Sequence, residues 1–233
     1  MVPYGGPMAV GRLRAVLPVR SRQHTTSLTS EVVCYECLVT TPTLTPGAER
    51  ILQTASRLFY ECGIHAVGVD RVAEESGVTK RTLYDRFGSK EALVLAYLQR
   101  RETGWRQTLA DELALHPQPG RERILAVFDA ATRMHDESSK GCSAVNARAE
   151  QAPDVRGHVI AEEAIAQKAW MRGQFEALCT QAGYAHPDSL SAQLQILLDG
   201  ALVTLGTRSV AAPLAVARQT AAIVLDAAPT RKS

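Results

Sequence analysis

The sequence predicts an all-α protein, and three observations favour that class. Aromatic residues make up only 5% of the 233 residues while alanine and leucine are plentiful, a mix that favours helices over sheets. From about residue 44 onward, apolar residues recur at spacings of three and four. Proline and glycine stand at the edges of these periodic segments, where helices begin and end. An apolar content of 45% is enough to fill a sizeable helical core.

The charge balance and the number of cysteines limit which classes of function are possible. There are 26 basic against 24 acidic residues, so any contact with nucleic acid must come from a local basic patch. No uninterrupted apolar run is long enough to span a bilayer, so we expect no transmembrane helix. Five cysteines are an odd count that favours a reducing cytoplasm over a disulfide framework. Cys34 and Cys37 form a C-x-x-C pair, but without a second pair metal or redox chemistry is the weaker interpretation.

Residues 1–43 differ from the remainder. Residues 1–30 contain four arginines and no acidic residue, with scattered proline and glycine. A transit peptide has this composition, but the apolar residues lack a helical repeat. We therefore expect a disordered, dispensable N-terminal extension, or a segment upstream of the true start.

The first predicted helix begins at Thr45-Pro46, because threonine caps a helix and proline suits its first turn. An apolar stripe follows, and Gly63 ends the helix. A short second helix begins near Val69, and Gly77 closes it.

The third predicted helix begins at the cap Thr79. Leu83 and Phe87 are four residues apart and form its buried face. Gly88 stops this helix, and Ser89 caps the fourth.

Three short helices with a glycine-containing turn before the third describe a helix-turn-helix unit. From residue 77 to residue 90 there are four cationic side chains against one acidic side chain, a net charge of +3. Such a helix fits the major groove of DNA, about 12 Å wide. On composition alone, a solvated helix in an ordinary bundle is an equal alternative.

The spacing of particular residues favours the first interpretation. The segment Gly77-Val78-Thr79 is followed by Leu83-Tyr84, by Phe87 and by Ser89-Lys90-Glu91. In this pattern, and with a long helical remainder, residues 45–103 resemble the TetR (tetracycline-repressor) family of bacterial transcription regulators.

The resemblance implies a DNA-binding site of seven residues: Thr79, Lys80, Arg81, Thr82, Tyr84, Arg86 and Lys90. The first four begin the recognition helix and are candidates for base edges and nearby phosphates. Tyr84 and Lys90 match positions that bind backbone phosphate, and Arg86 stands where histidine is common. Arg81 replaces a frequent glycine or proline and is able to grip guanine through two hydrogen bonds. Gly68 replaces a capping threonine, so the cap of the second helix is weaker.

The remaining chain predicts a helical body. We expect a long helix from residue 90 to about 116, then helices after Gly120, from 141 to 153, to about Gly183, from Pro187 and from Pro213. The resemblance implies that the last two helices pair with their copies in a two-fold dimer, and their stripes also suit an intramolecular core.

The resemblance also implies a ligand pocket among the central helices. Its six candidate residues are Trp105, Phe128, Cys142, Asn146, Trp170 and Phe175. Most of them suit plain core packing equally well. Asn146 and Glu150 share a helix face and suit either a structural network or a ligand clamp. Cys142 and Cys179 are either oxidant sensors or, more simply, inert buried thiols.

We therefore expect three parts: an extension over residues 1–43, a helix-turn-helix DNA-binding domain over 44–104, and a ligand-binding and dimerisation domain over 105–228. The expected function is a cytoplasmic, ligand-responsive repressor that binds an inverted-repeat operator as a homodimer and answers to a small, largely apolar effector. We find no convincing enzyme motif and expect neither cofactor nor metal. The alternatives are a helical module that binds a small molecule or protein without DNA, and a transcriptional activator.

Overall fold

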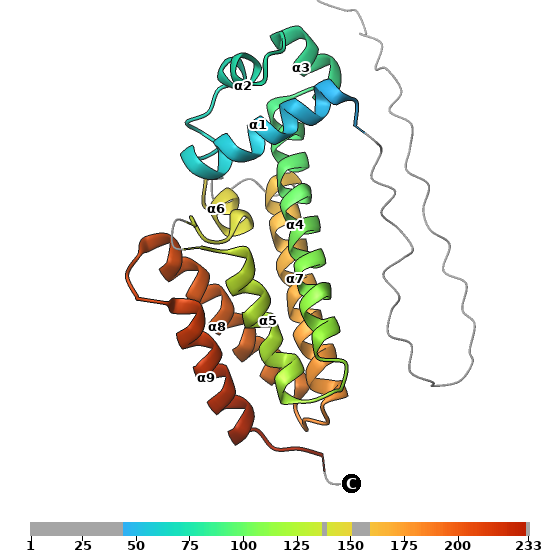
Figure 1. Cartoon of the computed structure of the whole chain (residues 1–233), viewed down its shortest axis with the longest axis vertical. Coiled ribbons are helices and arrows are strands. Elements are labelled where there is room, and N and C mark those ends of the chain that lie inside the picture. The colour runs from blue at the N-terminus through green and yellow to red at the C-terminus, as the bar shows by residue number, and fades with distance from the viewer. Residues whose placement is uncertain (1–43, 137–138, 151–158, 232–233) are drawn as a thin grey trace, which may run out of the picture. The chain divides into compact units, whose positions relative to one another are not determined.

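The computed structural model describes residues 44–136, 139–150 and 159–231. These residues form nine α-helices and no strand beyond one antiparallel bridge between Tyr184 and Thr230. The all-α prediction is confirmed for this part of the chain (Figure 1). The expectations for residues 1–43, including the Cys34 and Cys37 pair, lie outside the described residues.

Three short helices pack together at one end of the long helix α4 (Figure 1). They are α1 (Pro46–Cys62), α2 (Val69–Ser76) and α3 (Lys80–Phe87), and α4 spans Lys90–Leu115. The predicted caps form, because Thr45 Oγ accepts a hydrogen bond from the Ala48 N–H at 3.4 Å and Ser89 Oγ accepts one from the Ala92 N–H at 3.0 Å. We call these three helices and the first half of α4 the head.

The head is built around a hydrophobic core, to which Ala147 and Ile160 from later in the chain also contribute. Its fully buried side chains include Ile51, Ala55, Leu58, Val67, Val72, Leu83, Leu93 and Leu98. The Phe59 ring packs edge-on against Tyr97, with centroids 5.8 Å apart. Burying so many aliphatic side chains supplies the hydrophobic free energy that holds such short helices, which are marginal in isolation.

Helices α5 (Arg121–Met134), α7 (Val159–Gln181), α8 (Pro187–Thr207) and α9 (Pro213–Ala227) form a second core around the other half of α4. The short helix α6 (Ser143–Ala149) packs mainly against α7 and contributes Ala147 to the head core. Phe128 and Phe175 lie at the centre of this core, with ring centroids 6.0 Å apart. We call this part the body. Because α4 contributes to both cores, it connects the head to the body (Figure 1).

Helix α8 is long and apolar enough to cross a membrane by length and composition alone. A core helix of a helical bundle passes the same test. Leu190, Leu194 and Leu198 of α8 are buried in the body core. Ala201 and Leu202 of the same helix are also buried, whereas Ile196 and Val203 are exposed.

A loop of the body crosses α8 at very short range. A Cβ atom on Gly141 would lie 2.3 Å from the Leu202 carbonyl oxygen, and one on Gly206 would lie 2.8 Å from the Lys140 carbonyl oxygen. Gly141 also has a φ of 78°, which glycine adopts without strain. The two glycines therefore let residues 139–142 lie directly on the backbone of α8.

We predict that Gly141→Ala lowers the free energy of unfolding by at least about 2 kcal/mol, because alanine adds both a strained φ and a backbone clash. Gly173→Ala is the matched control, since that glycine lies inside α7 with open space around its Cα. There alanine should stabilise the protein by up to about 1 kcal/mol. Urea unfolding measures both variants. Equal stability of Gly141→Ala and the wild type would contradict the close crossing.

Candidate nucleic-acid interface and cavity

The turn between α2 and α3 sets the direction of α3. Gly77 adopts the left-handed conformation with φ 67° and ends α2, and the Val78 N–H donates to the Ala73 carbonyl at 3.0 Å. Thr79 then caps α3, with its Oγ accepting from the Thr82 N–H at 3.1 Å. The expected weak start of α2 is also present, because Gly68 makes no side-chain cap hydrogen bond.

One buried side chain anchors α3 to the head. Leu83 is fully buried, and Phe87 is partly buried against the same core. The opposite side of the helix is open to solvent, where Tyr84 is 39% exposed and the Arg81 side chain is 91% exposed. The sequence therefore folds into a helix held by its apolar side that presents polar groups outward.

The seven predicted DNA-binding residues lie on this helix and at its two ends. The Thr79 and Thr82 hydroxyls are 2.9 Å apart, and Lys80 Nζ forms an ion pair with Asp70 Oδ1 at 2.9 Å. Arg81 Nε lies 3.9 Å from the Asp85 carboxylate, at the limit of an ion pair. Tyr84 and Arg86 are exposed, and Lys90 is partly buried where α4 begins.

Electrostatics distinguish the two lysines. The hydrogen bond and charge of Asp70 raise the pKa of Lys80, whereas burial lowers the pKa of Lys90 despite the distant charge of Glu150. Both partners of the Lys80–Asp70 pair are exposed, so solvent screens the pair and it holds the Lys80 ammonium only weakly.

Polar contacts tie the end of α1 to the loop that crosses α8. The Tyr60 hydroxyl lies 2.5 Å from Ser139 Oγ, and it accepts a hydrogen bond from the Lys140 N–H at 3.0 Å. Ser139 Oγ is also 2.7 Å from His135 Nδ1, at the end of α5. Burial lowers the pKa of His135 to about 4, so its ring is neutral at pH 7. A chain of three side chains thus runs from the head into the body.

A second tie comes from Glu150 at the end of α6. Its carboxylate accepts hydrogen bonds from the backbone N–H groups of Ile64, at 3.0 Å, and His65, at 2.7 Å. Partial burial acts to raise the pKa of Glu150, but these backbone hydrogen bonds outweigh it and lower the pKa. Asn146 donates to the Lys140 carbonyl at 2.9 Å. These hydrogen bonds join Asn146 and Glu150 to the backbone around them, and both residues also line a second cavity of about 340 Å³ next to α1.

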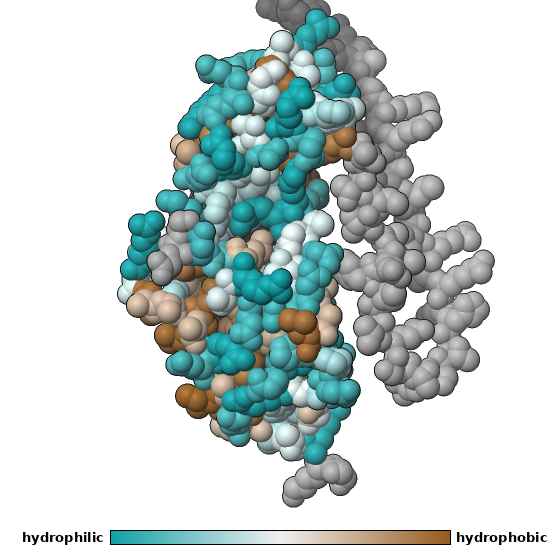
Figure 2. Space-filling model, viewed as in Figure 1, coloured by the Kyte–Doolittle hydropathy of each residue, from teal (hydrophilic) through white to brown (hydrophobic). Residues whose placement is uncertain are grey.

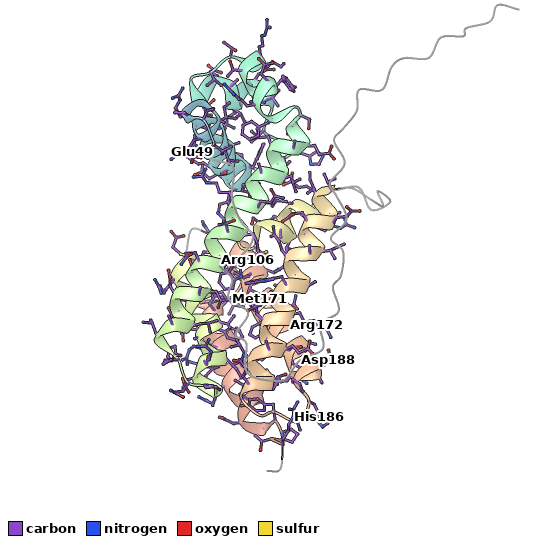
Figure 3. The ribbon with its side chains drawn as sticks, turned by 90° about the vertical axis from the view of Figure 1, so that its right-hand side faces the viewer. Glu49, Arg106, Met171, Arg172, His186 and Asp188 are labelled. Carbon is purple, nitrogen blue, oxygen red and sulfur yellow. The ribbon has the colours of Figure 1, made fainter. Side chains whose placement is uncertain are left out.

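A cavity of about 70 Å³ lies where α4, α5, α7 and α8 meet the crossing loop. Figure 3 shows two residues at this level, Arg106 on α4 and Met171 on α7, between the two long helices. The apolar part of the lining includes Trp105, Met134, Met171, Leu198 and Leu202. The polar part consists of Arg101, Glu102, His135, Cys142, Ser143, Gln167 and Lys168.

Two of the six predicted ligand residues line this cavity, Trp105 and Cys142. The other four predicted residues do not line this cavity. Phe128 and Phe175 are fully buried and pack against each other in the body core. The Trp170 ring lies under the Arg106 guanidinium, with its centroid 4.2 Å from Cζ, and Asn146 is an exposed residue of α6.

The charged lining residues were not predicted from the sequence. Charged residues in a long helix usually face solvent, so Arg101, Glu102 and Lys168 are not expected to line a cavity. For Arg101 the helical register indicates otherwise, because it stands four residues after Tyr97 and four before Trp105, on the apolar side of α4.

The two cysteines that we considered as oxidant sensors lie in different surroundings. Cys179 is fully buried in the body core, and burial raises its pKa to about 12, so the thiol is inert. Cys142 is partly buried at the cavity wall beside Lys168.

Comparisons with known proteins agree with this geometry. Residues 51–97, from α1 to the first half of α4, match the family model of the bacterial regulatory proteins of the tetR family. Over 96 residues the chain is 35% identical to the HTH-type transcriptional activator FasR of Mycolicibacterium smegmatis, covering 40% of this chain and 42% of FasR. Over 104 residues it is 29% identical to the HTH-type transcriptional repressor NemR of Escherichia coli, covering 44% of this chain and 52% of NemR. The chain thus spans about half the length of these relatives.

The similarity in structure extends further along the chain. A crystal structure of a TetR-family transcriptional regulator from Streptomyces coelicolor matches with a TM-score of 0.68 and 28% sequence identity. The match covers 77% of this chain and 92% of that protein. The body as well as the head therefore has the fold of that regulator.

Proposed function

We propose that this chain, a member of the TetR family of bacterial regulatory proteins, is a DNA-binding transcriptional regulator. The observation that carries the proposal is α3 itself. It is a short helix capped by Thr79, anchored by the buried Leu83, and lined on its free side by cations and hydroxyls. We propose a head over residues 44–104 and a body over 105–228, acting in the cytoplasm.

In this proposal α3 enters the major groove and its first residues meet the bases. Arg81 is the candidate for bidentate contact with guanine, because its side chain is almost fully exposed. Tyr84, Arg86 and Lys90 hold the phosphate backbone on either side, which fixes the register of the helix without reading sequence. The Thr79 hydroxyl already accepts the capping hydrogen bond of α3, so a contact with DNA would be an additional interaction of this hydroxyl.

We propose that the last two helices form a homodimer. Ile196 and Val203 on α8 are seven residues apart, as are Val216 and Ile223 on α9, so each pair lies on one side of its helix. All four are exposed, by 71%, 49%, 47% and 69% of their surface. Figure 2 shows apolar residues gathered over α8 and α9. Such a patch is unusual on a monomer and favours pairing with a second copy into a four-helix bundle.

A two-fold dimer presents two α3 helices, so we propose an inverted-repeat operator with half-sites about 34–36 Å apart or a multiple of that distance. A small molecule in the cavity would change this spacing through the two ties to the head. Its binding and DNA binding then oppose each other by the same free energy, about 1–3 kcal/mol in typical cases.

We propose repression as the direction of control, which is the usual mode implied by the resemblance. The two named relatives include one activator and one repressor, so the direction is decided by a reporter assay on the adjacent promoter. Higher reporter output after deletion of the protein supports repression, and lower output supports activation.

The first test concerns the phosphate contacts. We predict that Lys90→Ala and Tyr84→Phe each weaken binding to the adjacent intergenic DNA and to random duplex DNA by similar factors. Lys90→Ala should also reduce the slope of log affinity against log salt concentration by about 0.9, the share of one phosphate. Fluorescence anisotropy at several salt concentrations measures both quantities. Arg121→Ala is the control, since Arg121 lies on α5 and pairs with Asp226. An unchanged salt slope for Lys90→Ala would remove Lys90 from the interface.

The second test concerns assembly. We predict that the double variant Ile196→Glu/Ile223→Glu is a folded monomer, because buried unpaired carboxylates would be costly in the dimer and harmless on an exposed surface. Ile165→Glu on α7 is the matched control, with a side chain that is also largely exposed, at 63%. Light scattering gives the mass, and circular dichroism checks the fold. A double variant that remains a dimer would show that copies pair through another surface.

A further inference from the structure

One cation in the cavity has no anionic partner among the described residues. Arg101 is partly buried and lines the cavity, and its Nε is shielded from solvent without any hydrogen-bond partner. Within residues 44–136, 139–150 and 159–231 no carboxylate forms an ion pair with it. Two other arginines of α4 do form ion pairs: Arg100 with Glu49 at 2.6 Å and Arg106 with Glu102 at 2.6 Å.

The groups around Arg101 do not supply the missing charge. Its guanidinium lies over the ring of Tyr60, with Cζ 3.9 Å from the centroid. His135, which shares the cavity wall, is neutral at pH 7, because burial lowers its pKa to about 4. Glu102 lines the cavity and pairs with Arg106, and burial, with the nearby charge of Glu163, raises the pKa of Glu102 to about 7. Asp199 pairs with Lys168 Nζ at 2.5 Å.

A shielded guanidinium nitrogen without an acceptor is unfavourable, since buried polar groups otherwise find hydrogen-bond partners. Planar N–H groups of arginine match the two oxygens of a carboxylate. We propose that the cavity binds a small carboxylate, with the charged end on Arg101 and the apolar end against Trp105, Met171 and Leu198. This inference rests on the proposed function, for which it names the class of effector. It replaces the largely apolar molecule that the sequence led us to expect.

The size of the cavity and the charge of candidate ligands further limit which molecules are suitable. The cavity of about 70 Å³ is under half the volume of an apolar cavity of about 150 Å³ that holds benzene. It therefore suits a carboxylate with a chain of a few carbons. Inorganic phosphate is less suitable, because it carries more charge and has no apolar part to set against Trp105 and Leu198.

The position of Arg101 also connects the ligand to the head. Tyr60, whose ring Arg101 covers, belongs to α1 and makes the hydrogen bonds to Ser139 and the Lys140 N–H. A carboxylate that draws the guanidinium toward the cavity removes its contact with that ring. The ligand thus acts on the contact between α1 and the crossing loop, which is the proposed path to α3.

The test compares small carboxylates with neutral amides of matched size, each added to the full chain at constant ionic strength. The carboxylates are acetate, propionate and butyrate, and the amides are propionamide and butyramide. Tryptophan fluorescence and thermal unfolding report binding. We expect the carboxylates to change the fluorescence of Trp105 and to raise the Tm, and the amides of equal size to bind at least tenfold more weakly. Equal binding of acids and amides, or tighter binding of inorganic phosphate, would overturn the proposal.

Variants assign the effect to one side chain. Arg101→Met keeps an unbranched side chain without the charge and should weaken the best carboxylate at least tenfold, while Arg101→Lys should retain part of the affinity. Arg100→Met is the matched control, because the neighbouring Arg100 pairs with Glu49. Unchanged affinity in Arg101→Met would overturn the assignment. If Arg101→Met does not fold, the comparison of Arg101→Lys with the wild type and the acid–amide comparison decide the question.

Binding to the adjacent intergenic DNA is measured in the same preparations without probe. A protein that binds DNA but prefers no carboxylate leaves the proposed function standing and removes this inference. A protein that binds carboxylates but no DNA does the opposite.

Discussion

The arrangement of this molecule depends on the close crossing of residues 139–142 over α8. The crossing is possible because Gly141 and Gly206 leave room for two backbones to meet without intervening side chains. It fixes Ser139 where its hydroxyl reaches Tyr60 of the head and His135 of the body at once. It also places Cys142 in the wall of the cavity and starts α6, whose last turn delivers Glu150 to the backbone of Ile64 and His65. This loop therefore positions the cavity and, together with the apolar packing of α4, holds the head.

Helix α4 explains why the cavity lies where it does. Its first half fills the head core with Tyr97 and Leu98, and its second half fills the body core with Leu109. Arg101 and Trp105 lie between these stretches, where neither core is complete, so space and shielded polar groups remain. A ligand at this boundary touches the helix that connects the two parts. That position, rather than the chemistry of any single residue, makes a coupling between cavity and α3 reasonable.

The sequence predicted the local features well and the distant ones poorly. Helix ends follow from neighbouring residues, so the caps Thr45, Thr79 and Ser89 and the stop at Gly77 are confirmed. The cavity is different, because its lining comes from segments up to about a hundred residues apart. Phe128 and Phe175 are core residues, while Arg101, whose Nε has no hydrogen-bond partner in the described part of the chain, looked like an ordinary surface arginine.

Footprinting of this chain on its adjacent intergenic DNA tests most directly whether α3 reads DNA. We expect protection of an inverted repeat whose half-site centres are about 34–36 Å apart, or a multiple of that distance, with contacts in successive major grooves. We also expect random duplex DNA to compete only weakly. Protection that random DNA abolishes equally well, or no protection at concentrations where the protein is a folded dimer, would contradict a sequence-reading role for α3.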